Sequence, residues 1–539
     1  MLQALLALPI STILLLLPSL YITVTLFHHL LSPNLHIPGP FLARFTRLWY
    51  LYKIYRGDFE LTNIELHKKY GPVVRIAPGE YSIDDVGAAK DIYGHGNKFV
   101  KVNYSHHVIT YTPSCRYFHK YTKCIKKERK LIMIQAPWYW AWMPPDPNKA
   151  SLFAELNPHR HSLQRRKFAS AYSMSSLVGY EPFVDNCTSL FISRFQELAH
   201  TNSQHVNFAH WFQCYAFDVI GEITFGQRFG FLDAGVDKDG VFAAIEARSS
   251  YSTFVGVFPA LHAMLFPLLP KSGGHAYVGN YTRSQIASKE QALKDPKIEK
   301  REGKEDFVSK FLDIKSEDPE KMTALDIFTI CQSNIGAGSD TTAITLSAVL
   351  YYLLKHPRTF ETLRKEIDDG ATAGMVSDPV TFKEANEMPY LQAVIKEALR
   401  LHSATGLPLA RVVPPSGADL AGHHFAAGTT VGINSWVAHH NSEVYGNDAE
   451  AWRPERWLEM QEQGRGAEVE KYFFAFGMGS RTCIGKNLSL LEVSKLIPQV
   501  VRKFDFVLEE GVRREGWRCE SRWFVKPVDF WGALVERAR

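Results

Sequence analysis

The pattern of apolar and polar residues along the chain predicts a protein built mainly from α-helices. Apolar residues recur at helical spacing over residues 323–356, after Pro389, and over residues 488–497. Thr323 with Asp326 three residues later forms a predicted capping box at the start of the first of these helices. Most of the remaining chain has the same helical periodicity.

Only a few stretches predict strands, and the clearest is an early hairpin. Val73-Val74-Arg75-Ile76 and Tyr81-Ser82-Ile83 flank a turn at Ala77-Pro78-Gly79. Neither an internal repeat nor a Gly/Ser linker divides the chain. The expected fold class is therefore mainly α with small peripheral β-sheets.

The N-terminus predicts a membrane anchor, because the first 27 residues contain no Asp, Glu, Lys or Arg. As a helix, residues 2–27 would be about 39 Å long, enough to cross a hydrocarbon core of about 30 Å. We predict a transmembrane anchor over residues 1–31 and a proline-rich hinge over residues 32–40. Basic residues that begin at Arg44 place the following domain, residues 41–539, in the cytosol. A secretory signal peptide is the alternative, but no basic residue precedes the apolar run and no small-residue cleavage site follows it.

Cys483 is the candidate for chemistry, in the string Phe476-Gly477-Met478-Gly479-Ser480-Arg481-Thr482-Cys483-Ile484-Gly485. The helix predicted after it would offer unpaired N–H groups and the positive end of its dipole, which stabilise a thiolate. Arg481 adds a positive charge, and a lone thiolate suits haem iron. An inert buried thiol is the alternative. Seven scattered cysteines give no disulfide framework.

The string resembles the haem-binding loop of the cytochrome P-450 family in its spacing of Phe476, Gly479, Arg481, Cys483 and Gly485. The resemblance implies a cytochrome P-450 fold as one large domain. It also implies haem b as cofactor, with Cys483 as axial ligand of the iron and Phe476 and Gly485 in the loop around the thiolate.

The hexapeptide Ala337-Gly338-Ser339-Asp340-Thr341-Thr342 is similar to the family's distal-helix motif. Glycine and hydroxyl residues destabilise a helix interior, so they need a reason. A glycine that only forms a kink is the alternative for Gly338, but it does not explain the adjoining Asp340 and Thr341. The resemblance implies that Gly338 leaves room for dioxygen and that Asp340 and Thr341 handle its protons.

Glu397 and Arg400 lie three residues apart on the helix after Pro389. Such a pair is common and contributes about 0.2–0.5 kcal/mol when exposed. With Arg456 in Trp452-Arg453-Pro454-Glu455-Arg456-Trp457, it resembles the family's Glu-Arg-Arg triad. The implied role is structural, namely to lock the loop that positions the cysteine.

Four cationic or potentially cationic residues resemble the family's ligands for the haem propionates. His161 and Arg165 are one helical turn apart, and His161 stands where the family usually has Trp. Arg411 and Arg481 complete the set, because guanidinium groups pair well with carboxylates in partly buried sites.

The resemblance implies a monooxygenase that inserts one atom of O2 into a hydrophobic small molecule. Electrons from NADPH would arrive through a separate NADPH-cytochrome reductase at the endoplasmic reticulum membrane. Segments such as Asn157-Pro158-His159-Arg160-His161 are similar to filamentous-fungal members related to pisatin demethylase, many of which act in secondary metabolism. Alternatives are an oxygen-independent haem-thiolate isomerase or dehydratase, and a haem-based electron carrier or sensor.

Residues 114–142 form an insert that is atypical of the family. Between Arg116 and Lys130 it holds seven basic residues and the single acid Glu128, whereas the whole chain has a net charge of +5. Such a run can bind nucleic acid or anionic lipid. No recognition motif accompanies it, so we expect no nucleic-acid partner. A solvated excursion is the favoured interpretation, and a retained intron is the alternative.

Deleting residues 1–31 is expected to release much of the protein from membranes while haem incorporation persists, because the apolar run lies outside the predicted catalytic domain. Fractionation of cells expressing the full and truncated chains measures this. Glycosylation or secretion of the truncated chain in its native host would show that the predicted topology is wrong.

Overall fold

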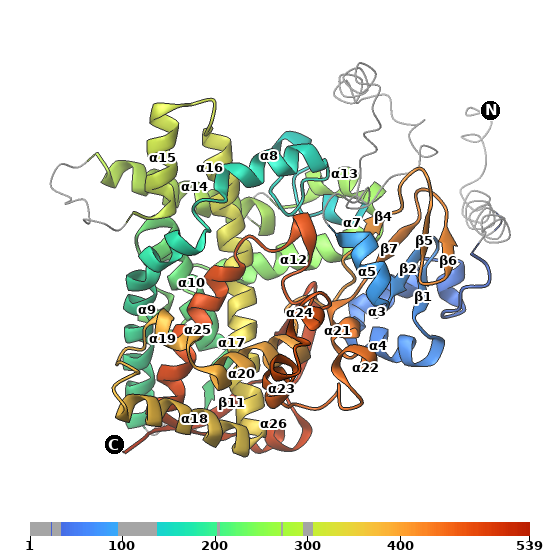
Figure 1. Cartoon of the computed structure of the whole chain (residues 1–539). Helices are drawn as coiled ribbons and strands as arrows, with labels where there is room; N and C mark the ends of the chain where they lie inside the picture. The colour runs from blue at the N-terminus through green and yellow to red at the C-terminus, as the bar shows by residue number, and fades with distance from the viewer. Residues whose placement is uncertain are drawn as a thin grey trace.

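The computed structural model describes residue 23 and residues 34–94, 137–201, 205–270, 273–294 and 305–538. Helices make up most of it, as the mainly α prediction requires, and the strands between residues 73 and 83 and between residues 411 and 432 lie together at one side (Figure 1). The longer helices are α3 (Leu48–Arg56), α4 (Phe59–Tyr70), α8 (Pro158–Phe168), α9 (Met174–His200), α10 (Phe208–Phe225), α12 (Val241–Val257), α14 (Gly274–Ala292), α15 (Phe307–Glu317), α16 (Ala324–Ser333), α17 (Ser339–Lys355), α18 (Pro357–Thr372), α20 (Pro389–Leu401) and α25 (Lys486–Lys503).

Shorter helical segments connect these elements. They are η1 (Leu42–Arg44), α5 (Val86–Tyr93), α7 (Pro137–Trp140), η3 (Pro147–Lys149), α11 (Phe231–Ala234), η4 (Pro259–Leu261), α13 (His262–Leu265), η5 (Phe266–Leu268), η6 (Asn334–Gly338), α19 (Phe382–Asn386), α21 (Ser435–His439), α22 (Ser442–Tyr445), α23 (Glu455–Glu462), α24 (Gly466–Glu470), η7 (Gly479–Arg481) and α26 (Glu510–Glu515).

The strands form four small sheets. They are β1 (Val73–Ala77), β2 (Glu80–Ile83), β3 (Val206–Asn207), β4 (Arg411–Val412), β5 (Ala418–Leu420), β6 (His423–Phe425), β7 (Thr430–Gly432), β8 (Phe504–Leu508), β9 (Cys519–Arg522), β10 (Phe524–Pro527) and β11 (Trp531–Glu536). The largest sheet has the order β1-β2-β7-β4, with β1 and β2 antiparallel and Val73 opposite Ile83. This confirms the predicted hairpin.

The predicted helix over residues 323–356 is present but interrupted. Thr323 and Asp326 form the capping box, α16 and α17 follow, and the π-helical turn η6 separates them. A π turn inside an α-helix often marks a functional site. At the end of η6, a Cβ on Gly338 would lie 2.7 Å from Cδ1 of Ile220 on α10. Gly338 is therefore required for close packing of α10, a different reason from the expected room for dioxygen.

The described part of the predicted hinge is packed against the sheets. Ile37 is fully buried, the backbone N–H of Arg75 donates to Pro38 O at 2.9 Å, and Asn34 Nδ2 donates to His424 O at 2.7 Å. Residues 34–40 are thus part of the folded domain, and a free hinge could only precede them.

The predicted anchor lies outside the described residues, apart from residue 23. Within the described residues, no single helix has the length and apolar character needed to cross a bilayer. The pair Val241–Val257 and Pro259–Leu268, bent by 118°, meets those requirements jointly by length and composition.

The end of the predicted insert is part of the core, which corrects its boundary. Tyr139, Ala141 and Trp142 are buried, and the Trp138 ring lies 4.5 Å from the ring of Trp523. Aromatic rings cluster here because each buries a large apolar area. A deletion that extends to residue 142 would remove these contacts, so any dispensable segment ends before residue 137. The basic residues 116–130 lie outside the described residues.

A buried carboxylate, Glu397 on α20, holds together the elements beneath the cysteine loop. Its two oxygens accept from Arg400 Nε at 2.9 Å and Nη2 at 2.8 Å, from Arg456 Nε at 3.0 Å and from Trp457 Nε1 at 2.9 Å. The Glu397, Arg400 and Arg456 side chains have no exposed surface. The structure thus brings the three members of the expected triad into one hydrogen-bonded group.

His439 connects this group to the cysteine loop. Its Nδ1 donates to Arg400 O at 2.9 Å, its Nε2 accepts from the Phe474 N–H at 2.8 Å, and Arg400 Nη1 donates to His439 O at 2.7 Å. Burial, reinforced by the positive charge of Arg400, lowers the pKa of His439 from 6.5 to about 3. Only the neutral ring can accept from Phe474 while it donates to Arg400.

Replacing His439 by Gln is expected to flatten the loss of stability at acid pH. Because the folded pKa is depressed, the stability contributed by neutral His439 is present above pH 6.5 and is lost as pH falls from 6.5 toward 3. Chemical denaturation at pH 7 and pH 5 should show that the wild type loses about 2 kcal/mol more than the variant.

The matched control is His159→Gln, because His159 is exposed. It should keep the wild-type pH dependence. An equal loss in wild type and His439→Gln would mean that folding does not lower the pKa of His439.

Candidate active site

The cysteine loop runs from Phe474 into α25 and closes on itself. The Cys483 N–H donates to Phe476 O at 2.8 Å, and the Gly477 N–H donates to Phe474 O at 2.9 Å. Gly477 and Gly479 have φ angles of 68° and 65°, which L side chains rarely adopt. The loop therefore depends on these two glycines.

The Cys483 thiol faces two opposing influences. Cys483 has solvent-exposed surface, but many protein atoms lie around its sulfur. This burial raises the pKa of the Cys483 thiol. The N–H groups of Gly485 and Lys486 at the start of α25, and the charge of Arg165, act in the opposite direction. The helix start thus favours a thiolate, as predicted, but burial outweighs it in the protein alone. A metal cation that binds the sulfur would drive deprotonation.

Three arginines from separate elements gather around this loop. Arg165, on the helix α8 that Asn157 caps, donates through Nη1 to Thr482 O at 2.7 Å. Arg481 Nη1 donates to Glu155 O at 2.6 Å, and Arg411 on β4 donates to Ala410 O at 2.9 Å. Burial and then the neighbouring charge of Arg411 lower the pKa of Arg481 to about 9.

Among the described residues, none of these three arginines forms an ion pair with an Asp or Glu side chain. A cluster of partly buried cations that repel one another fits an anionic group. The donor set, one thiol beside three guanidinium groups, fits haem, which presents an iron and two carboxylates. Cys483 would ligate the iron, and Arg165, Arg411 and Arg481 would hold the propionates.

The remaining predicted residues lie around the same loop. His161 is buried one turn before Arg165 on α8. Phe476 is half-buried, and Lys486 Nζ lies 5.7 Å from the centre of its ring. Gly485 is the N-cap of α25, and a Cβ there would lie 3.9 Å from Cys483 Sγ.

Sequence analysis missed two tyrosines at this site. Tyr139 is buried, which raises its pKa, while Arg411 opposes the shift by its charge and a hydrogen bond. Tyr93 accepts from the Ile433 N–H at 2.8 Å, and the Arg411 guanidinium lies 4.9 Å from its ring centre. Both tyrosines position Arg411, and no local pattern could have identified them because their partners are hundreds of residues away.

The predicted acid and alcohol lie on the first turn of α17 and have different partners. Thr341 Oγ1 donates to Ala337 O at 2.9 Å, and Ala337 is exposed, so this turn has an open face. Asp340 is buried, accepts from Gln213 Nε2 at 2.8 Å, and pairs with Lys526 Nζ at 2.7 Å. Adjacent residues on a helix point about 100° apart, so one helical turn presents the hydroxyl and the carboxylate to different surroundings.

Lys526 on β10 continues this polar chain. Its Nζ also lies 2.8 Å from Glu246 Oε2, and the Glu246 side chain is 42% exposed. Burial works to lower the pKa of Lys526, but Asp340 and Glu246 outweigh it and raise the pKa. A charged Lys526 thus joins the buried Asp340 to a carboxylate that contacts solvent.

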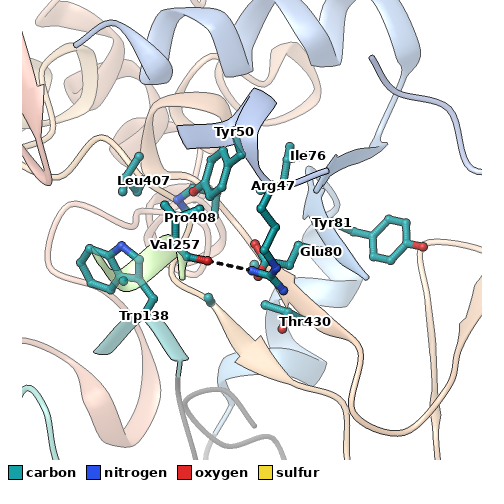
Figure 2. A pocket seen from close by; sticks show the side chains of 13 residues that line it. Arg47, Tyr50, Ile76, Glu80, Tyr81, Trp138, Val257, Leu407, Pro408 and Thr430 are labelled. Carbon is teal, nitrogen blue, oxygen red and sulfur yellow. Dashed lines mark hydrogen bonds and ion pairs between the residues drawn. The ribbon is translucent and has the colours of Figure 1, made fainter. Parts of the chain in front are cut away.

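A pocket lies between the β1–β2 hairpin, α7 and the end of α12 (Figure 2). Trp138, Val257, Leu407 and Pro408 line it, and Arg47 at its rim pairs with Glu80 and donates to Val257 O at 3.5 Å. Its walls are mostly apolar, but none of them comes from the cysteine loop or α17.

The sequence comparisons agree with this fold and site. The cytochrome P-450 family model matches residues 140–527. The chain therefore belongs to the cytochrome P-450 family, whose members are haem-containing oxidoreductases that incorporate oxygen.

Curated relatives are similar over almost the whole chain. Pisatin demethylase from Fusarium vanettenii is 38% identical over 91% of this chain and 87% of its own length. The cytochrome P-450 monooxygenase cicH from Emericella nidulans is 35% identical over 93% and 94%, and gsfF from Penicillium aethiopicum is 32% identical over 92% of each.

Gly479→Ala is expected to disrupt the cysteine loop. An added Cβ would lie 1.8 Å from the backbone oxygen of Tyr93, which cannot move aside as a flexible side chain could. The positive φ of 65° alone would cost about 1–2 kcal/mol. Haem content per protein and the thermal midpoint should both fall.

Gly511→Ala is the matched control, because Gly511 lies on α26 with no atom within 4 Å of its added Cβ. Its effect should be neutral or slightly stabilising. Wild-type haem content in Gly479→Ala would show that the loop tolerates a shift of the Tyr93 backbone.

Proposed function

We propose that this chain is a membrane-anchored haem-thiolate monooxygenase of the endoplasmic reticulum that inserts one oxygen atom of O2 into a hydrophobic small molecule. The catalytic domain lies in the cytosol, and a separate NADPH-cytochrome reductase supplies electrons. Haem, held by Cys483 and the three arginines, would supply the chemistry with dioxygen. The chain holds the haem, positions the substrate and delivers protons.

The observation that carries this proposal is the open turn of α17. Thr341 presents its hydroxyl there through a hydrogen bond to Ala337 O, next to the buried carboxylate of Asp340. A hydroxyl that is held in place and adjoins a carboxylate can organise water and transfer a proton to a bound oxygen species. An isomerase that uses hydroperoxides needs no such proton supply.

Protons reach Asp340 from solvent through its ion-paired neighbours. Glu246 contacts solvent, Lys526 bridges Glu246 and Asp340, and Gln213 orients the carboxylate. A break in the ion pair between Lys526 and Asp340 frees the Asp340 carboxylate to turn toward Thr341. Lys526 is thus a positioning residue, and Asp340 and Thr341 act on the bound oxygen.

The substrate is an intermediate of fungal secondary metabolism. Relatives that cover more than nine-tenths of this chain include pisatin demethylase and another fungal monooxygenase. We expect a hydrophobic substrate that is recognised mainly by shape.

Thr341→Ala is expected to uncouple electron consumption from product formation. Haem and substrate should still bind, but without the hydroxyl the proton supply is disordered, and reduced oxygen leaves as hydrogen peroxide. Product per NADPH should fall and hydrogen peroxide should rise. Loss of a positioned proton donor costs about 10²–10⁴ in the rate of the step it assists, and water reduces this effect. NADPH, peroxide and product are measured together in the reconstituted system.

Thr345→Ala is the matched control, one turn further along α17, where the hydroxyl donates to Thr341 O at 3.0 Å. It should remain coupled. Unchanged coupling in Thr341→Ala would place the proton path elsewhere. Full activity of that variant on a hydroperoxide without reductase would favour the isomerase alternative.

Cys483→Ser should abolish the thiolate-type spectrum of the carbon monoxide complex, and a variant that retained it would exclude Cys483 as ligand.

A further inference from the structure

Arg248 on α12 is a partly enclosed cation without an anionic partner among the described residues. Its Nη2 donates to Trp142 O at 3.2 Å, and its Nε is shielded from solvent and has no acceptor. Burial is the cause of a pKa lowered to about 10, and no carboxylate counters it. An enclosed guanidinium without a counter-charge is costly, so a fold that retains one has a reason to do so.

The Arg248 guanidinium lies against the turn that precedes the catalytic hydroxyl. A Cβ on Gly336 of η6 would lie 3.4 Å from Arg248 Nη1. Gly336 directly precedes Ala337, whose oxygen accepts from Thr341. Because Gly336 has no side chain, the Arg248 guanidinium can lie beside the open face of this turn.

The charged groups around Arg248 do not neutralise it. Glu246, two residues earlier on α12, is engaged by Lys526 at 2.8 Å. His275 on α14 is held neutral, because burial and then the charge of Arg248 lower its pKa well below 6.5. Within the described part of the chain, the local charge near Arg248 is thus positive.

Three further hydrogen-bond groups lie on or near α12 without partners in the described part of the chain. The indole N–H groups of Trp138 and Trp142 and the hydroxyl of Thr253 are buried without partners among the described residues. Buried donors normally find acceptors, and a ligand can provide them. The surplus of donors over acceptors favours a ligand that carries acceptor oxygens.

We propose that Arg248 binds a carboxylate on the substrate, so that the hydrophobic substrate is an apolar carboxylic acid. This inference rests on the proposed function, because it places the substrate between α12 and the open turn of α17. The guanidinium holds the carboxylate near Gly336, and the adjoining apolar part of the molecule lies toward Ala337 and Thr341. Arg248 thus selects the substrate and sets which carbon faces the bound oxygen.

The experiment compares two carboxylates with their uncharged methyl esters on the haem-loaded full-length protein. Naphthalene-2-carboxylate and dodecanoate serve as probes, and equilibrium dialysis gives their dissociation constants. At least one acid should bind about tenfold or more tighter than its ester, as expected for a charge-assisted hydrogen bond. Arg248→Gln should abolish this preference, and Arg248→Lys should retain part of it.

Two further variants separate recognition from folding. Gly336→Val should displace the guanidinium and reduce the acid-to-ester preference with Arg248 still present. Arg283→Gln is the matched control, because Arg283 is exposed and lies over the ring of Phe328 on α16. It should leave the preference unchanged.

Absence of a preference for either acid in the wild type would overturn the inference, as would an intact preference in Arg248→Gln. If Arg248 merely tethers Trp142, Arg248→Gln would lower thermal stability and weaken acid and ester binding equally, which also overturns it. The thiolate-type carbon monoxide spectrum of each protein separates these outcomes from failure of the proposed function. Its loss in the wild type would refute the haem-thiolate assignment itself.

Discussion

The buried carboxylate of Glu397 is the interaction on which the site depends most. Two arginines, the Trp457 indole and the Arg453 backbone N–H all donate to it, and all lie near the cysteine loop. Removal of one partner of such a group would leave an uncompensated buried charge, which costs about 3–5 kcal/mol. Through Arg400 and the neutral ring of His439, the network reaches the Phe474 N–H at the start of the loop. The network thus fixes the start of the loop that carries the thiol.

Around the Glu397 network, the described residues of the site carry more positive charge than their carboxylates neutralise. They also hold more hydrogen-bond donors than their acceptors can pair. Beside Cys483 lie three arginines without carboxylate partners among the described residues, namely Arg165, Arg411 and Arg481. Arg248, next to the turn that contains Gly336, also lacks a carboxylate partner among these residues. Unpaired buried cations oppose folding, so each excess indicates an anion that binds later. The arginines beside Cys483 fit the propionates of haem, and Arg248 is the basis for the proposed carboxylate of the substrate.

The helical segment formed by η6 and α17 has low helix propensity at the turn where we expect the chemistry. Gly336 and Gly338 lower helix propensity, and the backbone forms a π turn between α16 and α17. Contacts elsewhere offset this weakness: Gly338 allows close packing against Ile220, and Thr342 bonds to Ser489 of α25 at 3.1 Å. The helix can therefore present Ala337 and Thr341 openly while its remaining faces stay buried.

The sequence by itself determined the helical class, the hairpin, the capping box at Thr323 and the family, because periodicity, caps and a spaced motif are local properties. It also identified Glu397, Arg400 and Arg456, though only the resemblance connected them. Tertiary structure decided the partners: Lys526 beside Asp340, His439 beneath the loop, Tyr139 beside Arg411 and Arg248 above Gly336. It also showed that Tyr139, Ala141 and Trp142 belong to the core. Charge pairing and packing act through space between residues far apart in the chain, so no local pattern encodes them.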